Sequence, residues 1–149
     1  DEALKNIRVR DVEVETPLAT ATCRVIDEHV VVVPILRAGV GRLDGILALI
    51  PSARVGFVGL ERDEETARPS SYYQKMPHQI RGGISIIVDP MLATGGSTVA
   101  AIDMLREQGA KRIVVVCIVT CPEGLQAVEK AHPDVNVYAA SIDPELNEK

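Results

Sequence analysis

Residues 84–97, Ile-Ser-Ile-Ile-Val-Asp-Pro-Met-Leu-Ala-Thr-Gly-Gly-Ser, decide the fold class of this chain. Apart from Ser85, residues 84–88 are apolar and β-branched, as in a strand that is covered on both faces. Asp89 then stands at the carboxyl end of the expected strand, and a helix is expected over residues 98–108. A buried strand that leads through a short turn into a helix is typical of an α/β fold.

The turn over residues 93–97, Ala-Thr-Gly-Gly-Ser, has the composition of a phosphate-binding loop. Its glycines allow the backbone to approach an anion closely. Backbone N–H groups, two hydroxyls and the N-terminus of a helix can then point at one phosphate. The residues alone leave a second interpretation open, in which residues 89–90 begin an ordinary loop and Thr-Gly-Gly-Ser only caps a helix.

The rest of the chain alternates apolar strand patterns with helical ones, which predicts a mostly parallel sheet with helices on both faces. The N-terminal residues 9–26 alternate apolar and polar side chains like an edge hairpin. With no internal repeat or visible boundary, residues 1–149 are predicted to form a single domain around about five strands. Strands are expected over residues 30–35, 55–60, 84–88, 113–120 and 135–140, and helices over residues 43–50, 98–108 and 122–131.

Residues 61–83 interrupt this alternation. The stretch is charged, contains prolines and has no helical period. Connections of this length are usually functional lids or disordered. We therefore expect a long mobile loop over residues 61–83.

Composition excludes several classes of function. The chain has 149 residues, of which 46% are hydrophobic and 25% charged, which fits one globular domain with a sizeable core. A net charge of −5 and 3% aromatic residues argue against a nucleic-acid-binding face. No apolar run approaches the roughly 20 residues of a membrane span, and no charged-then-apolar leader opens the chain. We expect a cytoplasmic protein with neither a nucleic acid nor a membrane as partner.

The cysteines and histidines do not indicate a metal site. The chain has 3 cysteines, an odd count without a C-x-x-C pair, so neither a disulfide framework nor a zinc knuckle is predicted. Cys117 lies in an apolar strand pattern and is expected to be a buried, reduced thiol. The histidines have no spacing that suggests metal ligation, so no metal-binding residue is predicted.

Residues 86–97 resemble the phosphoribosyl pyrophosphate signature of type I phosphoribosyltransferases. Residues 89–97, Asp-Pro-Met-Leu-Ala-Thr-Gly-Gly-Ser, are similar to the signature of the uracil phosphoribosyltransferase family, in which proline replaces a second acidic residue. Further segments resemble the same family in the same order, and the resemblance covers most of the chain from Val30 onward. They are the pyrophosphate loop at residues 34–39, the mobile loop at residues 61–66 and 72–77, and the last shared stretch at residues 131–135 and 140–143.

The resemblance implies a set of residues that bind phosphoribosyl pyrophosphate. Arg37 and Arg62 would contact the pyrophosphate, Asp89 the ribose hydroxyls, and the turn the 5′-phosphate. Met91 and Leu92 are expected to be a packed shoulder that contacts the ligand by backbone. The implied set is Arg37, Arg62, Asp89, Pro90, Met91, Leu92, Ala93, Thr94, Gly95, Gly96 and Ser97.

The resemblance also implies a reaction, in which uracil and phosphoribosyl pyrophosphate give uridine monophosphate and pyrophosphate. Magnesium would be carried by the pyrophosphate, and no side chain is implied as nucleophile or catalytic base. A homodimer or higher homo-oligomer is expected. The residues leave two alternatives open, a phosphoribosyltransferase for another base and a non-catalytic phosphoribosyl pyrophosphate-binding regulator of pyrimidine metabolism.

The family's uracil-reading loop follows the segment that matches residues 141–148, and the sequence ends at Lys149. An N-terminal arm of the family is also expected to be missing. We therefore expect these 149 residues alone to hold ribose 5-phosphate compounds with little selectivity among bases.

Overall fold

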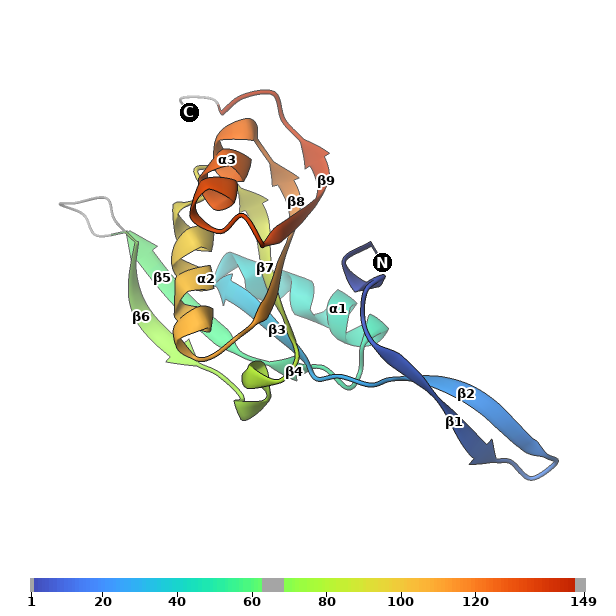
Figure 1. Cartoon of the computed structure of the whole chain (residues 1–149). Helices are drawn as coiled ribbons and strands as arrows, with labels where there is room; N and C mark the ends of the chain where they lie inside the picture. The colour runs from blue at the N-terminus through green and yellow to red at the C-terminus, as the bar shows by residue number, and fades with distance from the viewer. Residues whose placement is uncertain (1, 63–68, 147–149) are drawn as a thin grey trace.

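The computed structural model describes residues 2–62 and 69–146. Its centre is a 7-stranded sheet in the order β6-β5-β3-β7-β8-β9, with β4 beside β3 (Figure 1). Six of these strands run parallel and β6 runs antiparallel to them, which confirms an α/β fold, although the sheet has more than the five strands expected. Strands β4 and β5 pair with one side of β3, and four strands continue the parallel sheet from β3. These strands are β3 (Val30–Leu36), β7 (Ile84–Leu92), β8 (Arg112–Thr120) and β9 (Asn136–Ile142).

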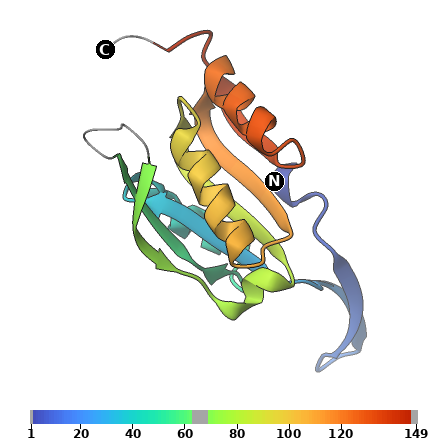
Figure 2. The same ribbon diagram turned by 60° about the vertical axis from the view of Figure 1, so that its left-hand side comes forward.

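Helices cover both faces of the sheet, as predicted (Figures 1 and 2). Side chains alternate along β3, so Val31 and Val33 pack in one core while Val30 and Val32 pack in the other. The first core is closed by α2 (Gly96–Glu107) and α3 (Pro122–Ala131), and the second by α1 (Leu43–Leu49). Burial on both faces explains why the central strands are almost continuously apolar.

Residues 61–83, which the sequence predicts to form a long mobile loop, contain regular secondary structure where the structure describes them. Strand β5 (Phe57–Arg62) continues past residue 61, and β6 (Pro69–Lys75) pairs with it antiparallel. The short 3-10 helix η3 (His78–Arg81) follows. Strand β6 carries polar residues on both faces and is defined by its pairing with β5, so its sequence lacks the apolar alternation of a core strand. Residues 63–68 lie outside the described residues, and the expected mobility stays a prediction.

Two other boundaries differ from the prediction. Residues 55–60 belong to two strands, because β4 (Arg54–Val55) pairs with β3 before Gly56 separates it from β5. Strand β7 continues through residues 89–92, because its pairing with β8 extends as far as Leu92 and Thr120. The signature therefore begins inside a strand, and α2 begins at Gly96 rather than at residue 98.

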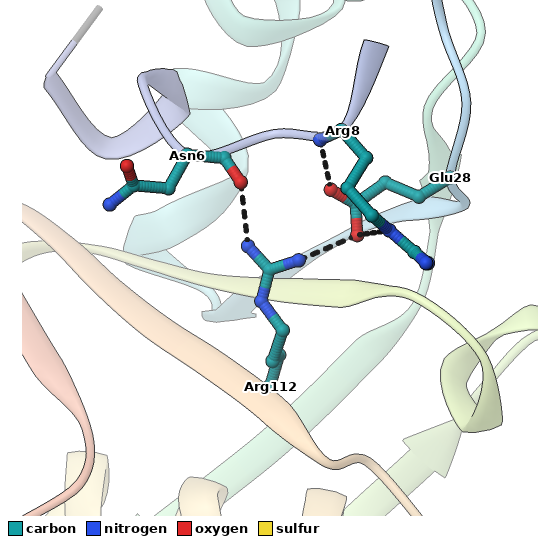
Figure 3. Close-up of polar contacts among 4 residues, drawn as sticks. All are labelled: Asn6, Arg8, Glu28 and Arg112. Carbon is teal, nitrogen blue, oxygen red and sulfur yellow. Dashed lines mark hydrogen bonds and ion pairs between the residues drawn. The ribbon is translucent and has the colours of Figure 1, made fainter. Parts of the chain in front are cut away.

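The N-terminal hairpin is present but does not form an edge of the main sheet. Strands β1 (Val9–Glu15) and β2 (Thr20–Ile26) form a separate two-stranded sheet that projects from the body (Figure 1). The Glu28 side chain, which is 1% exposed, ties its base to β8. Its carboxylate accepts hydrogen bonds from the Arg8 N–H at 2.6 Å and from Arg112 Nη1 at 2.8 Å, and Arg112 Nη2 donates to the Asn6 carbonyl (Figure 3).

Within the described residues, none of the helices combines the length and the apolar character needed to cross a membrane.

Candidate active site

The candidate site lies at the carboxyl edge of β3 and β7. These parallel neighbours are paired as far as Pro34 and Val88, so the chain that leaves each strand emerges at the same edge. Strand β3 leads through Arg37 into the 3-10 helix η2 (Ala38–Arg42), and the Leu36–Arg37 peptide bond is cis. Beyond Val88, β7 carries Asp89. The two segments predicted to bind one ligand thus begin side by side.

Gly39 allows the Arg37 segment to pack directly against β7. A Cβ atom at this position would collide with the Val88 carbonyl oxygen and lie 3.0 Å from Pro34 Cβ. No larger residue could occupy this point without moving η2 away from the strand. The exposed Arg37 is thereby held on the segment next to Asp89.

Asp89 is a half-buried carboxylate at the entrance to the turn. Burial raises its pKa, while a hydrogen bond that its Oδ1 accepts from the Met91 N–H at 3.5 Å acts in the opposite direction. Its neighbour on β8 is Cys117, a free and buried thiol as predicted. Burial, and then the charge of Asp89, raise the pKa of Cys117 to about 11. Among the described residues, no lysine or arginine forms an ion pair with Asp89.

The two glycines of the turn have different roles. Gly95 has φ +82°, in the left-handed region, and a Cβ atom there would lie 2.7 Å from Ala127 Cβ. The Cβ position of Gly96 meets nothing within 4 Å. Backbone conformation and packing therefore require glycine at Gly95, whereas Gly96 leaves open space beside the backbone.

The N-terminus of α2 is open toward this space. Gly95 is its N-cap and provides no side-chain hydrogen bond, while the Val99 N–H bonds back to the Gly95 carbonyl at 2.9 Å. The N–H groups of the first turn of a helix have no partner within the helix, and they carry the positive end of its dipole. This is the geometry that binds a phosphate.

Two adjoining cavities lie at the turn. A hollow of about 100 Å³ is lined by Thr98 and by every residue from Asp89 to Ser97 except Pro90. A larger pocket of about 420 Å³ shares Met91, Ala93 and Thr94 with it and extends between the carboxyl ends of β8 and β9. The structure therefore places eight of the eleven predicted residues around the hollow.

The remaining predicted residues differ in their surroundings. Leu92 is 1% exposed and packs in the core as expected, but Met91 is 49% exposed, so its prediction as a packed shoulder is wrong. Successive strand residues face opposite sides of the sheet, and Met91 faces the larger pocket.

Pro90 is half-buried at a point where β7 no longer pairs with β3. Arg62 ends β5 at the same edge of the sheet, and its side chain lies outside the described residues.

The sequence interpretation missed three residues that contact the segment leading into the turn, two of which, Thr120 and Cys121, also line the larger pocket. Thr120 ends β8, Cys121 is the N-cap of α3, and Gly124 lies in the first turn of α3. Their contacts to Leu92 and Ala93 depend on the pairing of β7 with β8. The sequence offered one signal for these residues: the strand expected over residues 113–120 also ends at the carboxyl edge of the sheet, next to the turn.

Asp89→Asn is expected to stabilise the free protein at neutral pH. Because the folded pKa of Asp89 is raised, the folded state binds its proton more tightly, and stability falls as pH rises through the interval above 3.8. Asparagine does not titrate, so the melting-temperature difference in favour of the variant should be present at pH 7 and disappear near pH 3. Calorimetric melting measures it, with Asp11→Asn on the hairpin as control. If the melting temperatures of the variant and the unsubstituted protein differ by the same amount at every pH, the raised pKa of Asp89 is wrong.

Gly95→Ala and Gly96→Ala are expected to separate stability from anion binding. Alanine at Gly95 must adopt the left-handed region against Ala127, which should cost about 1 to 3 kcal/mol in the free energy of unfolding. Alanine at Gly96 meets no atom of the fold but places a methyl group beside the hollow. It should leave the melting temperature nearly unchanged and weaken ribose 5-phosphate binding, measured by calorimetry. Unchanged affinity in the Gly96 variant would show that the turn only caps the helix.

The family model of uracil phosphoribosyltransferase matches residues 1–149. The uracil phosphoribosyltransferase of Ligilactobacillus salivarius is 55% identical over 148 residues, which cover 99% of this chain and 71% of that relative. The uracil phosphoribosyltransferase of Geobacillus kaustophilus is 51% identical, with the same 99% and 71% covered.

Solved structures agree with this match. The AQ2163 protein of Aquifex aeolicus superposes with a TM-score of 0.91 at 38% identity and covers 99% of this chain, with 71% of that protein matched. A hypoxanthine phosphoribosyltransferase of Staphylococcus aureus shares the fold, with a TM-score of 0.63 at 16% identity over 79% of this chain and 64% of its own. With its signature wrapped around the hollow after β7, the chain has the type I phosphoribosyltransferase fold and belongs to the uracil phosphoribosyltransferase family.

Proposed function

We propose that this protein transfers the phosphoribosyl group of phosphoribosyl pyrophosphate to uracil, giving uridine monophosphate and pyrophosphate in pyrimidine salvage. The proposal rests on the hollow that the signature residues form next to the segment of Arg37. The chain's membership of the uracil phosphoribosyltransferase family supports it. Residues 1–149 are proposed to act as one domain, since the strands of the main sheet share two continuous cores.

Each part of the sugar phosphate has a matching group. The 5′-phosphate would occupy the hollow, facing the open N-terminus of α2 and the backbone of Gly96 and Ser97. Asp89, which lines the same hollow, would accept hydrogen bonds from the ribose hydroxyls. Arg37 would bind the pyrophosphate, because its planar guanidinium can pair with two phosphate oxygens. Arg62, on the strand next to β3, is proposed to join it.

The uracil ring is proposed to occupy the larger pocket. This pocket adjoins the hollow through Met91, Ala93 and Thr94, so a base seated there lies next to the ribose. The half-exposed thioether of Met91 and the side chain of Val119 offer apolar contacts to the ring faces, while Asp143 and Glu145 are polar groups at its rim.

The arrangement fits a substitution at the anomeric carbon. The bond from this carbon to the pyrophosphate oxygen breaks, the bond to N1 of uracil forms, and the N1 proton is lost. Positive charge develops on the ribose while the pyrophosphate leaves as an anion, so Arg37 and Arg62 would stabilise the leaving group. The turn and Asp89 would hold the ribose in place for attack. No side-chain nucleophile is required, and we assign no catalytic base.

Magnesium is proposed to arrive bound to the pyrophosphate. Among the described residues, no group of three or more histidine, cysteine, aspartate or glutamate side chains could hold a metal ion. The turn offers the single carboxylate of Asp89, with Pro90 following it. This donor set fits an ion that is carried mainly by the substrate and supplies positive charge to the leaving group.

Cys23, Cys117 and Cys121 are free thiols. Free thiols fit a reducing compartment, and we propose the cytoplasm as the location of this protein.

The proposed activity is tested by measuring uridine monophosphate formation from uracil, phosphoribosyl pyrophosphate and magnesium, with cytosine, guanine and hypoxanthine as competing acceptors. With the family's uracil-reading loop joined to residues 1–149, uracil should be the preferred acceptor. Asp89→Asn should weaken phosphoribosyl pyrophosphate binding roughly 10- to 100-fold, the value of a charged hydrogen bond of about 1.5 to 3 kcal/mol. Lys130→Gln on the exposed side of α3 is the control. Preferential transfer to another base, or binding without transfer to any base when that loop is present, would contradict the proposal.

The projecting hairpin supports a homodimer or higher homo-oligomer. Cross-strand partners share a face, and one face is mostly apolar and made of residues that pack in neither core of the main sheet. A two-stranded hairpin is only marginally stable by itself, so we propose that a second copy covers this face. The apolar face consists of Val12, Val14, Ala21, Cys23 and Val25.

Val14→Lys should shift the protein toward the monomer in analytical ultracentrifugation, because it places a charge in the covered face. Thr22→Lys, which adds the same charge to the opposite face, should leave the assembly intact. A monomeric unsubstituted protein, or equal effects of both substitutions, would refute this role of the hairpin.

A further inference from the structure

The turn over residues 93–97, here called the ligand turn, is held by two buried donors at the junction of β8 and α3, and both donors also line the larger pocket. Thr120 is 1% exposed, and its Oγ1 donates a hydrogen bond to the Leu92 carbonyl at 3.0 Å. Cys121 is 2% exposed, and its Sγ donates to the Ala93 carbonyl at 3.0 Å. Leu92 and Ala93 are the last two residues before Thr94, so both donors act on the peptide bonds that lead into the turn.

The first turn of α3 fits against the same peptide bonds. A Cβ atom on Gly124 would collide with the Ala93 carbonyl oxygen and lie 2.8 Å from that of Leu92. In the other direction, a Cβ atom on Gly95 would lie 3.0 Å from the Gly124 carbonyl oxygen. The start of α3 and the ligand turn therefore interlock without intervening side chains.

These contacts fix the direction in which the turn faces. In a planar trans peptide, the carbonyl oxygen and the N–H of the next residue point to opposite sides. When Thr120 and Cys121 hold the Leu92 and Ala93 carbonyls on the α3 side, the N–H groups of Ala93 and Thr94 face away from α3. Ala93 and Thr94 line both the hollow and the larger pocket.

We propose that Thr120 and Cys121 are positioning residues for the phosphoribosyl site, and that they act by orienting the peptide planes that lead into the turn. The inference rests on the proposed function. Neither residue needs to contact the phosphate. Their hydrogen bonds hold the turn in its binding conformation before the ligand arrives, so losing them should weaken binding of the sugar phosphate more than it slows the chemical step.

The test uses paired substitutions. Thr120→Val removes a donor at nearly constant volume, and Cys121→Ala removes the thiol donor together with one buried sulfur atom, whereas Thr120→Ser and Cys121→Ser retain a hydroxyl donor at each position. The probes are ribose 5-phosphate binding by calorimetry, and the KM for phosphoribosyl pyrophosphate and kcat in the uracil assay. Val135→Ala, in the core but outside both cavities, controls for a general loss of stability.

The double variant Thr120→Val/Cys121→Ala should bind ribose 5-phosphate about tenfold more weakly, as expected for losing one or two hydrogen bonds that preorganise a site. Its KM should rise by a similar factor, with kcat changed less than twofold, and the double serine variant should recover most of the affinity. Val135→Ala should lower the melting temperature without changing affinity.

Unchanged affinity in the double variant, or a loss that the serine variants do not restore, would overturn the positioning role while leaving the proposed function in place. Failure of the unsubstituted protein to bind ribose 5-phosphate would overturn both.

Discussion

The parallel pairing of β3 with β7 is the constraint on which the rest of the site depends. It ends at Pro34 and Val88, so the chain leaves both strands at one edge of the sheet. Gly39 then allows the segment after β3 to rest on the backbone of β7. This pairing brings the segment that carries Arg37 beside the strand that carries Asp89, although the two are distant in sequence.

The same arrangement places polar groups where they are costly without a ligand. Asp89 is half-buried without a cationic partner among the described residues, and its pKa is raised as a result. Gly95 adopts a positive φ, and the N-terminus of α2 has no side-chain cap. The half-buried carboxylate and the uncapped helix N-terminus destabilise the free protein and match the hydroxyls and phosphate of a sugar phosphate, whereas glycine adopts the positive φ without strain. The apolar cores on both faces of the sheet offset the cost, as is common where stability and activity compete.

The sequence predicted the parts of the site that are local. The order of apolar strand, carboxylate, small turn and helix in residues 84–97 was sufficient to place Asp89 and the turn. The parts that depend on tertiary pairing were not predictable. Strand β6 exists because β5 pairs with it, Met91 faces the pocket because β7 continues past Asp89, and the hairpin stands apart because Glu28 anchors only its base. Thr120 and Cys121 carry no local signal, since the turn they support is almost thirty residues away in the chain.

The most direct measurement of the central claim is a titration of the isotopically labelled protein with ribose 5-phosphate, followed by amide nuclear magnetic resonance. If the turn after β7 holds the 5′-phosphate, the amide protons of Gly96, Ser97 and Thr98 shift more than any others, because their N–H groups become donors to a dianion. The amides of Glu129 and Lys130 on the exposed side of α3 should stay in place. Shifts at the turn no larger than those at Lys130 would contradict a phosphate site at the N-terminus of α2.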